Sequence, residues 1–272
     1  MNKAYHYVPQ YFLDPVHRIS VFLVGAGGTG SQMLSALARI DAALRSLGRK
    51  GLFVRVYDPD TVEEPNIGRQ LFTWSDLGTN KAECLVSRFN RIYGNDWEAE
   101  PRAFSPSRDE LPNIVITCVD NVRTRMEIGK RFRRAARDRA QNENYPFYWL
   151  DLGNGQRTGQ AFLGSNPVKQ PENAQYDTVP TLPTIAEQVD LDGVDERDSG
   201  PSCSLAEALT RQDLFVNSVL AMHAGHLLWS LLTDVALDVR GFWLNLESCR
   251  CAPVQVSTDD AALIPSTKTR SK

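Results

Sequence analysis

Residues 18–30, R-I-S-V-F-L-V-G-A-G-G-T-G, decide the fold of this chain. Their first part, residues 18–25, is largely β-branched and apolar up to a glycine, which is typical of a strand buried in a parallel sheet. Residues 29–47 then place apolar side chains at helical spacing, and Gly48 follows as a helix stop signal. The stretch therefore predicts a buried strand that passes through a glycine turn directly into a helix.

The same alternation of strand and helix continues along the chain. Further strands are predicted at residues 52–57, 113–119, 147–150 and 241–246, and further helices at residues 80–93 and 204–232. Residues 160–202 are rich in Pro, Asn, Asp and Gly and show little periodicity, which favours a long crossover loop. We therefore expect an α/β fold, Rossmann-like, with a mostly parallel sheet flanked by helices.

Length and composition agree with one folded domain. The 272 residues are 42% hydrophobic and contain 30 Lys and Arg against 33 Asp and Glu, which excludes the disordered and fibrous classes. No apolar run approaches the roughly 20 residues of a membrane helix, and residues 1–20 are too polar for a signal peptide. The odd number of cysteines does not suggest a disulfide framework. We expect a cytoplasmic protein with one domain over residues 1–257 and a disordered tail over residues 258–272.

One stretch, residues 123–139, is strongly basic and carries apolar residues at helical spacing. A helix with a solvated basic face explains it better than a nucleic-acid site, because the net charge of the chain is -3. An acidic protein partner is a third interpretation. Nucleic acid and membrane are therefore not expected partners.

The glycine turn matches the pattern G-x-G-x-x-G, with glycines at positions 25, 27, 28 and 30. Between a strand and a helix, such glycines permit a tight turn and a close approach of the backbone to a ligand. The first N–H groups of the helix then face a phosphate. The turn predicts a nucleotide site, but by itself it does not separate NAD from ATP.

The residues after the second predicted strand favour ATP. Asp58, at the tip of that strand, can hold a ribose through its hydroxyls, as a dinucleotide enzyme also requires. Arg69 and Lys81 add two cations near the phosphates, which suits the departure of pyrophosphate and is not needed for hydride transfer. Asp120 follows the strand at residues 113–119 and is well placed to hold Mg²⁺ directly or through water.

Together these motifs resemble the ThiF/MoeB/HesA superfamily, the ubiquitin-activating-type adenylating enzymes. The family pattern is G-x-G-G-x-G, then D-x-D-x-V-x-x-x-N-x-x-R-Q, then G-x-x-K-A, then a D-N pair, and all four parts occur in order here. The matching positions are Gly25, Gly27, Gly28, Gly30, Asp58, Asp60, Asn66, Arg69, Gln70, Lys81, Asp120 and Asn121. The resemblance implies that Asp58 holds the ATP ribose and that Asp120 binds Mg²⁺. It also implies that Asn66, Arg69 and Lys81 contact the phosphates.

The reaction that the resemblance implies is ATP-dependent adenylation of a carboxylate, the C-terminus of a small ubiquitin-like protein, with release of pyrophosphate. The implied cofactors are ATP and Mg²⁺. The implied partners are the ubiquitin-like protein, a conjugating-type protein and a second copy of the chain. The sequence looks most similar to stand-alone bacterial ThiF-family proteins such as those of PRTRC-type gene clusters. An NAD(P)-dependent oxidoreductase and a non-catalytic nucleotide-binding scaffold stay open as alternatives.

The cysteines divide into a candidate nucleophile and structural residues. Cys203 follows the long loop and precedes the predicted helix, and a helix N-terminus favours the thiolate, so Cys203 is the candidate acceptor for a thioester. The alternative is a small residue packed at a helix start. Many family members hold zinc with two C-x-x-C pairs, but Cys249 and Cys251 have the wrong spacing, so structural zinc is not expected. Cys118 is expected in the core.

Overall fold

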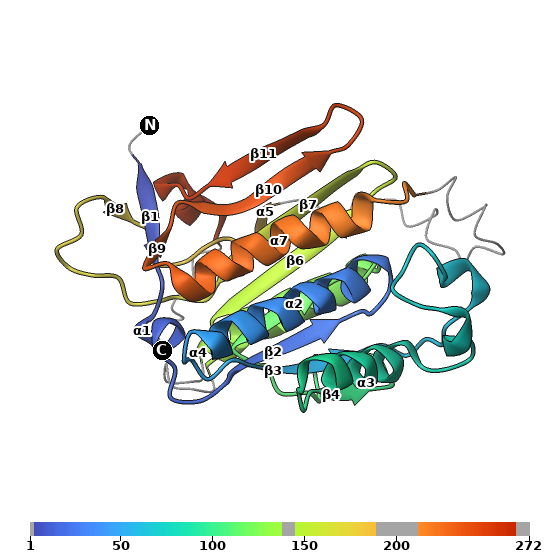
Figure 1. The fold of residues 1–272 in the computed structure, drawn as a ribbon. Coiled ribbons are helices and arrows are strands. Elements are labelled where there is room, and N and C mark those ends of the chain that lie inside the picture. The colour runs from blue at the N-terminus through green and yellow to red at the C-terminus, as the bar shows by residue number, and fades with distance from the viewer. Residues whose placement is uncertain (1–2, 138–144, 189–211, 265–272) are drawn as a thin grey trace.

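The computed structural model describes residues 3–137, 145–188 and 212–264, in which one large sheet lies between two layers of helices (Figure 1). Within these ranges the sheet has eight strands in the order β11-β10-β7-β6-β5-β2-β3-β4. Their bounds are β2 Ile19–Val24, β3 Leu52–Tyr57, β4 Glu98–Glu100, β5 Ile114–Thr117, β6 Tyr148–Asn154, β7 Thr158–Ser165, β10 Val239–Asn245 and β11 Arg250–Gln255.

Strand direction divides the sheet into two parts. The strands from β6 to β4 pair in parallel, whereas β7, β10 and β11 each pair antiparallel with their neighbours. The predicted Rossmann-like α/β fold is therefore confirmed. The antiparallel hairpins, with β7 and β11, were not predicted, because glycine dominates residues 153–159 and β11 is exposed along most of its length.

Helices cover both faces of the sheet. One face carries α2 (Gly28–Ser46), α3 (Lys81–Tyr93) and α7 (Val216–Thr233), and the other carries α4 (Val122–Arg137) and the short α5 (Ile185–Gln188). Figure 1 shows α2 and α7 side by side across the front of the sheet. The predicted helix at residues 80–93 is confirmed as α3, which begins after its N-cap Asn80 and ends at Gly94 in the left-handed conformation.

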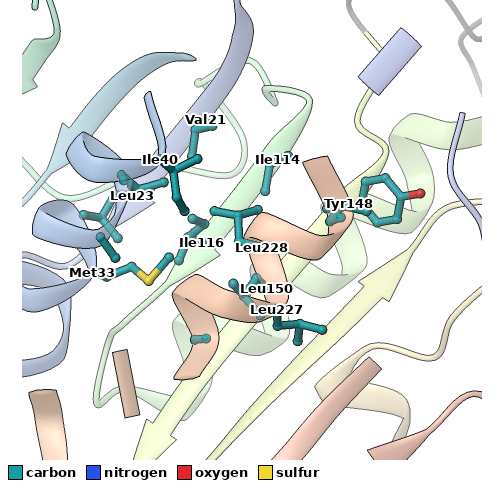
Figure 2. Packing of buried hydrophobic residues seen from close by; sticks show 14 of the residues in the cluster. Val21, Leu23, Met33, Ile40, Ile114, Ile116, Tyr148, Leu150, Leu227 and Leu228 are labelled. Carbon is teal, nitrogen blue, oxygen red and sulfur yellow. The ribbon is translucent and has the colours of Figure 1, made fainter. Parts of the chain in front are cut away.

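Strand β2 is buried on both faces, and this explains its unbroken apolar run. Figure 2 shows Val21 and Leu23 of β2 beside Ile114 and Ile116 of β5, with Met33 and Ile40 of α2 and Leu227 and Leu228 of α7 packed on them. Phe22 and Val24, which alternate with these residues along β2, pack on the opposite face in the cluster that includes α4. The strand is therefore held from both sides at the position where the glycine turn begins.

A second, small sheet joins the N-terminal segment to later parts of the chain. It pairs β1 (Ala4–Tyr7) with β8 (Asp177–Thr178) and β9 (Ala236–Leu237), next to the short helix α1 (Gln10–Leu13). His6 of β1 is fully buried: its Nδ1 donates to the Val179 carbonyl at 2.7 Å, and its Nε2 accepts from the Tyr148 hydroxyl at 2.9 Å. Burial lowers the pKa of His6 to about 4.

The segment predicted as a crossover loop over residues 160–202 begins later than predicted, and residues 166–188 are mostly irregular. Strand β7 continues to Ser165, and residues 166–188 contain β8 and α5. Val168 and Leu182 are buried there: the Val168 N–H donates to the Pro180 carbonyl, and the Leu182 N–H donates to the Ser165 hydroxyl. Residues 189–202 lie outside the described residues, and so does Cys203.

Two predicted boundaries near the C-terminal end are also corrected. The helix predicted at residues 204–232 is α7, which begins at Val216, since residues 212–215 are not helical and residues 204–211 lie outside the described part. In the tail predicted to be disordered over residues 258–272, the first six residues form a 3-10 helix, η4 (Thr258–Leu263), and residues 265–272 lie outside the described part. Asp260 of η4 is buried and accepts two hydrogen bonds from Arg240, which fixes this helix against the sheet. None of the described helices is long and apolar enough to span a membrane.

Candidate active site

The candidate site is a cleft of about 830 Å³ at the carboxyl ends of the parallel strands β2, β3, β5 and β6. Strand β2 has β3 on one side and β5 on the other, although β5 comes after β3 in the chain. The cleft therefore lies where the strand order reverses, which is the place where open α/β sheets bind ligands. Of the predicted site residues, all but Gly30 and Cys203 line it: Gly25, Gly27, Gly28, Asp58, Asp60, Asn66, Arg69, Gln70, Lys81, Asp120 and Asn121.

The glycine turn between β2 and α2 leaves no room for side chains at Gly25, Gly28 and Gly30, whereas a Cβ at Gly27 would meet nothing within 4 Å. Gly25 has φ +94°, and a Cβ at Gly30 would lie 1.9 Å from the Gly25 carbonyl oxygen. A Cβ at Gly28 would lie 2.5 Å from Nδ2 of Asn217 in α7. Gly30 was predicted to bind the nucleotide, but its place in the structure is behind the turn, where it permits the turn to close.

Asp58 joins the end of β3 to the glycine turn. Its Oδ2 accepts from the Ala26 N–H at 2.6 Å and its Oδ1 accepts from the Asp60 N–H at 2.9 Å. Burial raises the pKa of Asp58, and these two hydrogen bonds oppose that rise. The carboxylate is thus held in one orientation at the edge of the cleft, with lone pairs left over for ribose hydroxyls.

The segment after β3 brings its cations over the same cleft. Lys81, at the start of α3, is only 8% exposed, and its Nζ lies 3.0 Å from Oδ2 of Asp60. Asn66 ends the 3-10 helix η1 (Glu64–Asn66), where its Oδ1 accepts from the Glu63 N–H at 2.9 Å. The side chain of Lys81 therefore reaches the cleft with a single carboxylate partner from this segment.

Arg69 and Gln70 carry buried polar atoms that have no hydrogen-bond partner among the described residues. Arg69 donates from Nη1 to Oε1 of Gln212 at 2.5 Å, but its Nε is buried without a hydrogen bond. Oε1 of Gln70 is likewise buried and accepts no hydrogen bond from the described residues. Burial lowers the pKa of Arg69. Unpaired buried polar atoms of this kind are destabilising, and in a cleft they indicate a ligand that completes them.

Asp120 and Asn121 lie in the loop between β5 and α4. Asp120 is exposed to the cleft, and Asn121 accepts from the Thr124 N–H at 3.0 Å, which caps the start of α4. Within residues 3–137, 145–188 and 212–264, no three His, Cys, Asp or Glu side chains are grouped closely enough to hold a metal ion by themselves. An Asp120 carboxylate fits Mg²⁺ as one oxygen ligand among several from a nucleotide's phosphates.

Several cleft residues come from parts of the chain where no motif was visible. The Thr29 hydroxyl lies 2.8 Å from Oδ1 of Asn217 and 3.1 Å from Oδ1 of Asn154, and Asn217 donates to Gln212 at 2.9 Å. These amides connect the glycine turn, the end of β6 and the start of α7. Asn217 carried no signal in the sequence, because the helix was predicted to begin at residue 204. Its contact with the glycine turn could be found only from the packing of α7 on α2.

Arg125 of α4 also lines the cleft, and it forms a buried ion pair with Asp151 of β6. Its Nη2 donates to the Val119 and Leu152 carbonyls at 2.6 Å and 3.0 Å, and its Nε lies 3.3 Å from Oδ2 of Asp151. Burial raises the pKa of Asp151, while Arg125 and the Thr117 hydroxyl oppose that rise. The guanidinium thus ties the end of β6 to the loop that carries Asp120.

The cysteines occupy different environments. Cys118, expected in the core, lines the cleft beneath the glycine turn, and burial raises the pKa of its thiol. Cys249 and Cys251 are exposed at the hairpin between β10 and β11. Cys203, predicted as thioester acceptor, lies outside the described residues, so its role stays a prediction.

The protein is an α/β protein with a cleft at a reversal of strand order, and comparison with known proteins relates it to a family. The ThiF family model matches residues 4–137. Ubiquitin-activating enzyme E1 1 of Schizosaccharomyces pombe is 32% identical over 132 residues, which are 44% of this chain and 13% of that protein. The resemblance to the ThiF/MoeB superfamily that the motifs predicted is therefore confirmed for the N-terminal half of the chain.

Two further similarities extend this finding. tRNA threonylcarbamoyladenosine dehydratase 2 of Saccharomyces cerevisiae is 28% identical over 127 residues, which are 42% of this chain and 26% of that protein. The structure of E. coli MccB with ATP superimposes with a TM-score of 0.55 at 14% identity, over 90% of this chain and 64% of MccB. The chain therefore spans about a quarter or less of these two curated relatives and under two thirds of the solved structure.

Proposed function

We propose that this protein adenylates a carboxylate with ATP, giving an acyl-adenylate and pyrophosphate. The observation that carries the proposal is the pair of buried, unpartnered polar atoms, Nε of Arg69 and Oε1 of Gln70, in the cleft that the glycine turn and Lys81 share. A polyphosphate would accept a hydrogen bond from Nε of Arg69. Its negative charge would lie near the cations of Arg69 and Lys81 and near the N-terminus of α2. Relatives named as ubiquitin-activating enzymes, and a similar fold solved with ATP, support the nucleotide assignment.

The reaction follows from positioning and charge. One oxygen of the substrate carboxylate attacks the α-phosphorus, and the bond to the bridging oxygen breaks with its electron pair leaving on pyrophosphate. The carboxylate is already ionised, so no general base is required. Arg69 and Lys81 stabilise the negative charge that develops on the leaving group, and the glycine turn holds the phosphates through its backbone N–H groups. Mg²⁺, when bound at Asp120, would supply further charge neutralisation on the phosphates.

The acyl substrate that we propose is the C-terminus of a small ubiquitin-like protein. Relatives whose names refer to ubiquitin and Nedd8 activation support a protein substrate, and MccB with the peptide MccA supports a peptide carboxyl terminus. The proposal includes a homodimer and a conjugating-type partner. It also includes transfer of the acyl group to the Cys203 thiol, with AMP leaving as the thioester bond forms.

Nucleotide binding tests the first part of the proposal and separates it from the oxidoreductase alternative. Calorimetric titration should show binding of Mg-ATP and none of NADH. Asp58→Ala should weaken ATP binding by roughly 1.5–3 kcal/mol, because it removes charged acceptors for the ribose hydroxyls. Stronger binding of NADH than of ATP would refute the proposal.

Pyrophosphate exchange tests the chemistry and excludes a non-catalytic scaffold. With a cognate carboxylate, Arg69→Ala and Asp120→Ala should each lower the ATP–pyrophosphate exchange rate by about 10²- to 10³-fold. Lys130→Ala, which removes an exposed cation of α4 away from the cleft, is the matched control and should exchange at the wild-type rate. Cys203→Ser should keep exchange but abolish any thiol-sensitive adduct with the substrate, and an adduct that survives this change would exclude Cys203.

A further inference from the structure

The side chain of Arg69 is held at the cleft by an amide. Its Nη1 donates to Oε1 of Gln212 at 2.5 Å, and both side chains line the cleft. Within the described part of the chain, no carboxylate forms an ion pair with Arg69, and burial lowers its pKa. Gln212 occupies one of the five N–H donors of the guanidinium and leaves its positive charge in place. The cation is therefore fixed while its charge is kept for a ligand.

Gln212 is in turn anchored to the glycine turn through α7. The same Oε1 atom accepts from Nδ2 of Asn217 at 2.9 Å, and Asn217 is only 2% exposed. Oδ1 of Asn217 lies 2.8 Å from the Thr29 hydroxyl, which can donate its proton there. Nδ2 of Asn217 also packs on Gly28, where a Cβ would lie 2.5 Å from it. One chain of side chains thus joins the loop of Arg69, the start of α7 and the first turn of α2.

The chemistry of residue 212 suits a cation that is kept for an anion. A long arginine side chain loses rotamer freedom when it binds a ligand, and this weakens binding unless the side chain is ordered beforehand. A carboxylate at position 212 would also order Arg69, but it would neutralise the guanidinium and repel phosphates. The amide of Gln212 orders the guanidinium and does neither.

We propose that Gln212 is a positioning residue for phosphate recognition. Its carbonyl oxygen, held by Asn217, fixes the guanidinium of Arg69 at the part of the cleft where the proposed function puts the phosphates of ATP. The inference rests on the proposed function and adds to it a residue from the segment before α7, which carries none of the motifs quoted above. If Gln212 instead competed with the phosphates for Nη1 of Arg69, its removal would strengthen nucleotide binding.

Gln212→Met tests the sign of this effect, because methionine has a similar length and lacks the acceptor. Titration should show binding of the non-hydrolysable analogue Mg-AMPCPP weakened about five- to tenfold. Binding of adenosine, which has no phosphate and is titrated by NMR, should not change. Leu214→Ala, at an exposed neighbouring position outside the cleft, is the control and should bind both compounds as wild type does. Tighter AMPCPP binding in Gln212→Met, or an equal loss of adenosine binding, would overturn the proposal.

A double-mutant cycle with Arg69→Ala shows whether Gln212 acts through Arg69. In the Arg69→Ala protein, adding Gln212→Met should change AMPCPP affinity by less than about twofold, because no guanidinium is left to position. A purely structural role of Gln212 would give the same loss with and without Arg69. That result would overturn the proposal.

Gln212→Glu tests the role of the neutral amide. The carboxylate still accepts from Arg69 and Asn217, so the melting temperature should not fall. Its charge should weaken AMPCPP binding about tenfold or more, with a larger loss at low salt than at high salt. Unchanged affinity would overturn the proposal. If wild-type protein fails to bind AMPCPP, the proposed function is refuted and the role of Gln212 falls with it, whereas wild-type binding that the variants retain overturns the role of Gln212 alone.

Discussion

The Arg240–Asp260 pair and the Arg125–Asp151 pair are both buried, and they differ in how completely they are bonded. Arg240 donates to both oxygens of Asp260, at 2.8 and 2.9 Å, and its remaining nitrogen donates to Gln188 at 2.6 Å. Arg125 lies 3.3 Å from Asp151 without a hydrogen bond, and both Nε of Arg125 and Oδ1 of Asp151 are left unpartnered.

The difference follows the position of each pair. The complete pair fixes the 3-10 helix η4 to β10, away from the cleft, and each of its three nitrogens and two carboxylate oxygens takes part in a hydrogen bond. The incomplete pair lies at the cleft, between the loop of Asp120 and the end of β6. Burying charge without full hydrogen bonding is destabilising, so incomplete bonding at a cleft is expected where a ligand supplies the missing contacts.

The largest effect is expected when the complete pair is broken. Asp260→Ala should lower the free energy of unfolding by about 3–5 kcal/mol, because it leaves the Arg240 charge buried without its carboxylate. Urea denaturation gives this value, and AMPCPP affinity should not change. The neighbouring Asp259 is exposed, so Asp259→Ala should leave the free energy of unfolding nearly unchanged. If the two variants are equally stable, the Arg240–Asp260 pair does not hold η4.

His6 provides a buried group with both partners present, and its effect depends on pH. Its pKa is lowered to about 4 in the folded protein, so the unfolded chain takes up a proton first as the pH falls below about 6.5. The free energy of unfolding should therefore fall by about 1.4 kcal/mol per pH unit from pH 6.5 towards pH 4. His6→Gln should flatten this slope, whereas His226→Gln, at an exposed position, should retain it. An unchanged slope in His6→Gln would show that a group other than His6 causes the pH dependence of stability.

The smallest effect is expected for Asp151→Asn in the incomplete pair. The asparagine keeps an acceptor for Thr117 and removes a charge that burial already disfavours, so the loss should stay below about 3 kcal/mol. Because the folded pKa of Asp151 is raised, its contribution is present at low pH and is lost as the pH rises. Wild type should thus lose stability relative to Asp151→Asn as the pH rises above about 4. The opposite trend in urea denaturation would mean that Arg125 holds Asp151 fully ionised.

Features that follow from neighbouring residues could be predicted from the sequence, whereas features that need contacts between distant segments could not. Strand β3, helix α3 and the glycine turn follow from apolar spacing, an asparagine cap and steric need for glycine, which are all properties of adjacent residues. Of the site residues predicted up to Asn121, all except Gly30 line the cleft. They come together there because the carboxyl ends of the parallel strands lie at one edge of the sheet.

The remaining features depend on contacts between distant segments. Arg125 looked like one cation in a basic helix, and only the ends of β5 and β6 turn it into a cleft residue. Gln160 and Gly153 face each other because of a hairpin whose glycines read as a turn. The ordered segment at 258–263 was missed because its anchor, Arg240, lies on another element.

The hydrogen-bonding distance between Thr29 and Asn217 spans 188 residues of sequence, and this has a consequence for synthesis. At 5–20 residues per second, a ribosome needs roughly 10 to 40 s to pass from one residue to the other. Throughout that interval the glycine turn lacks the Asn217 side chain that packs on Gly28, and α2 lacks α7 beside it. A nucleotide bound as proposed would thus meet an incomplete cleft on the nascent chain, and its binding energy would be available to the fold only after α7 has left the exit tunnel.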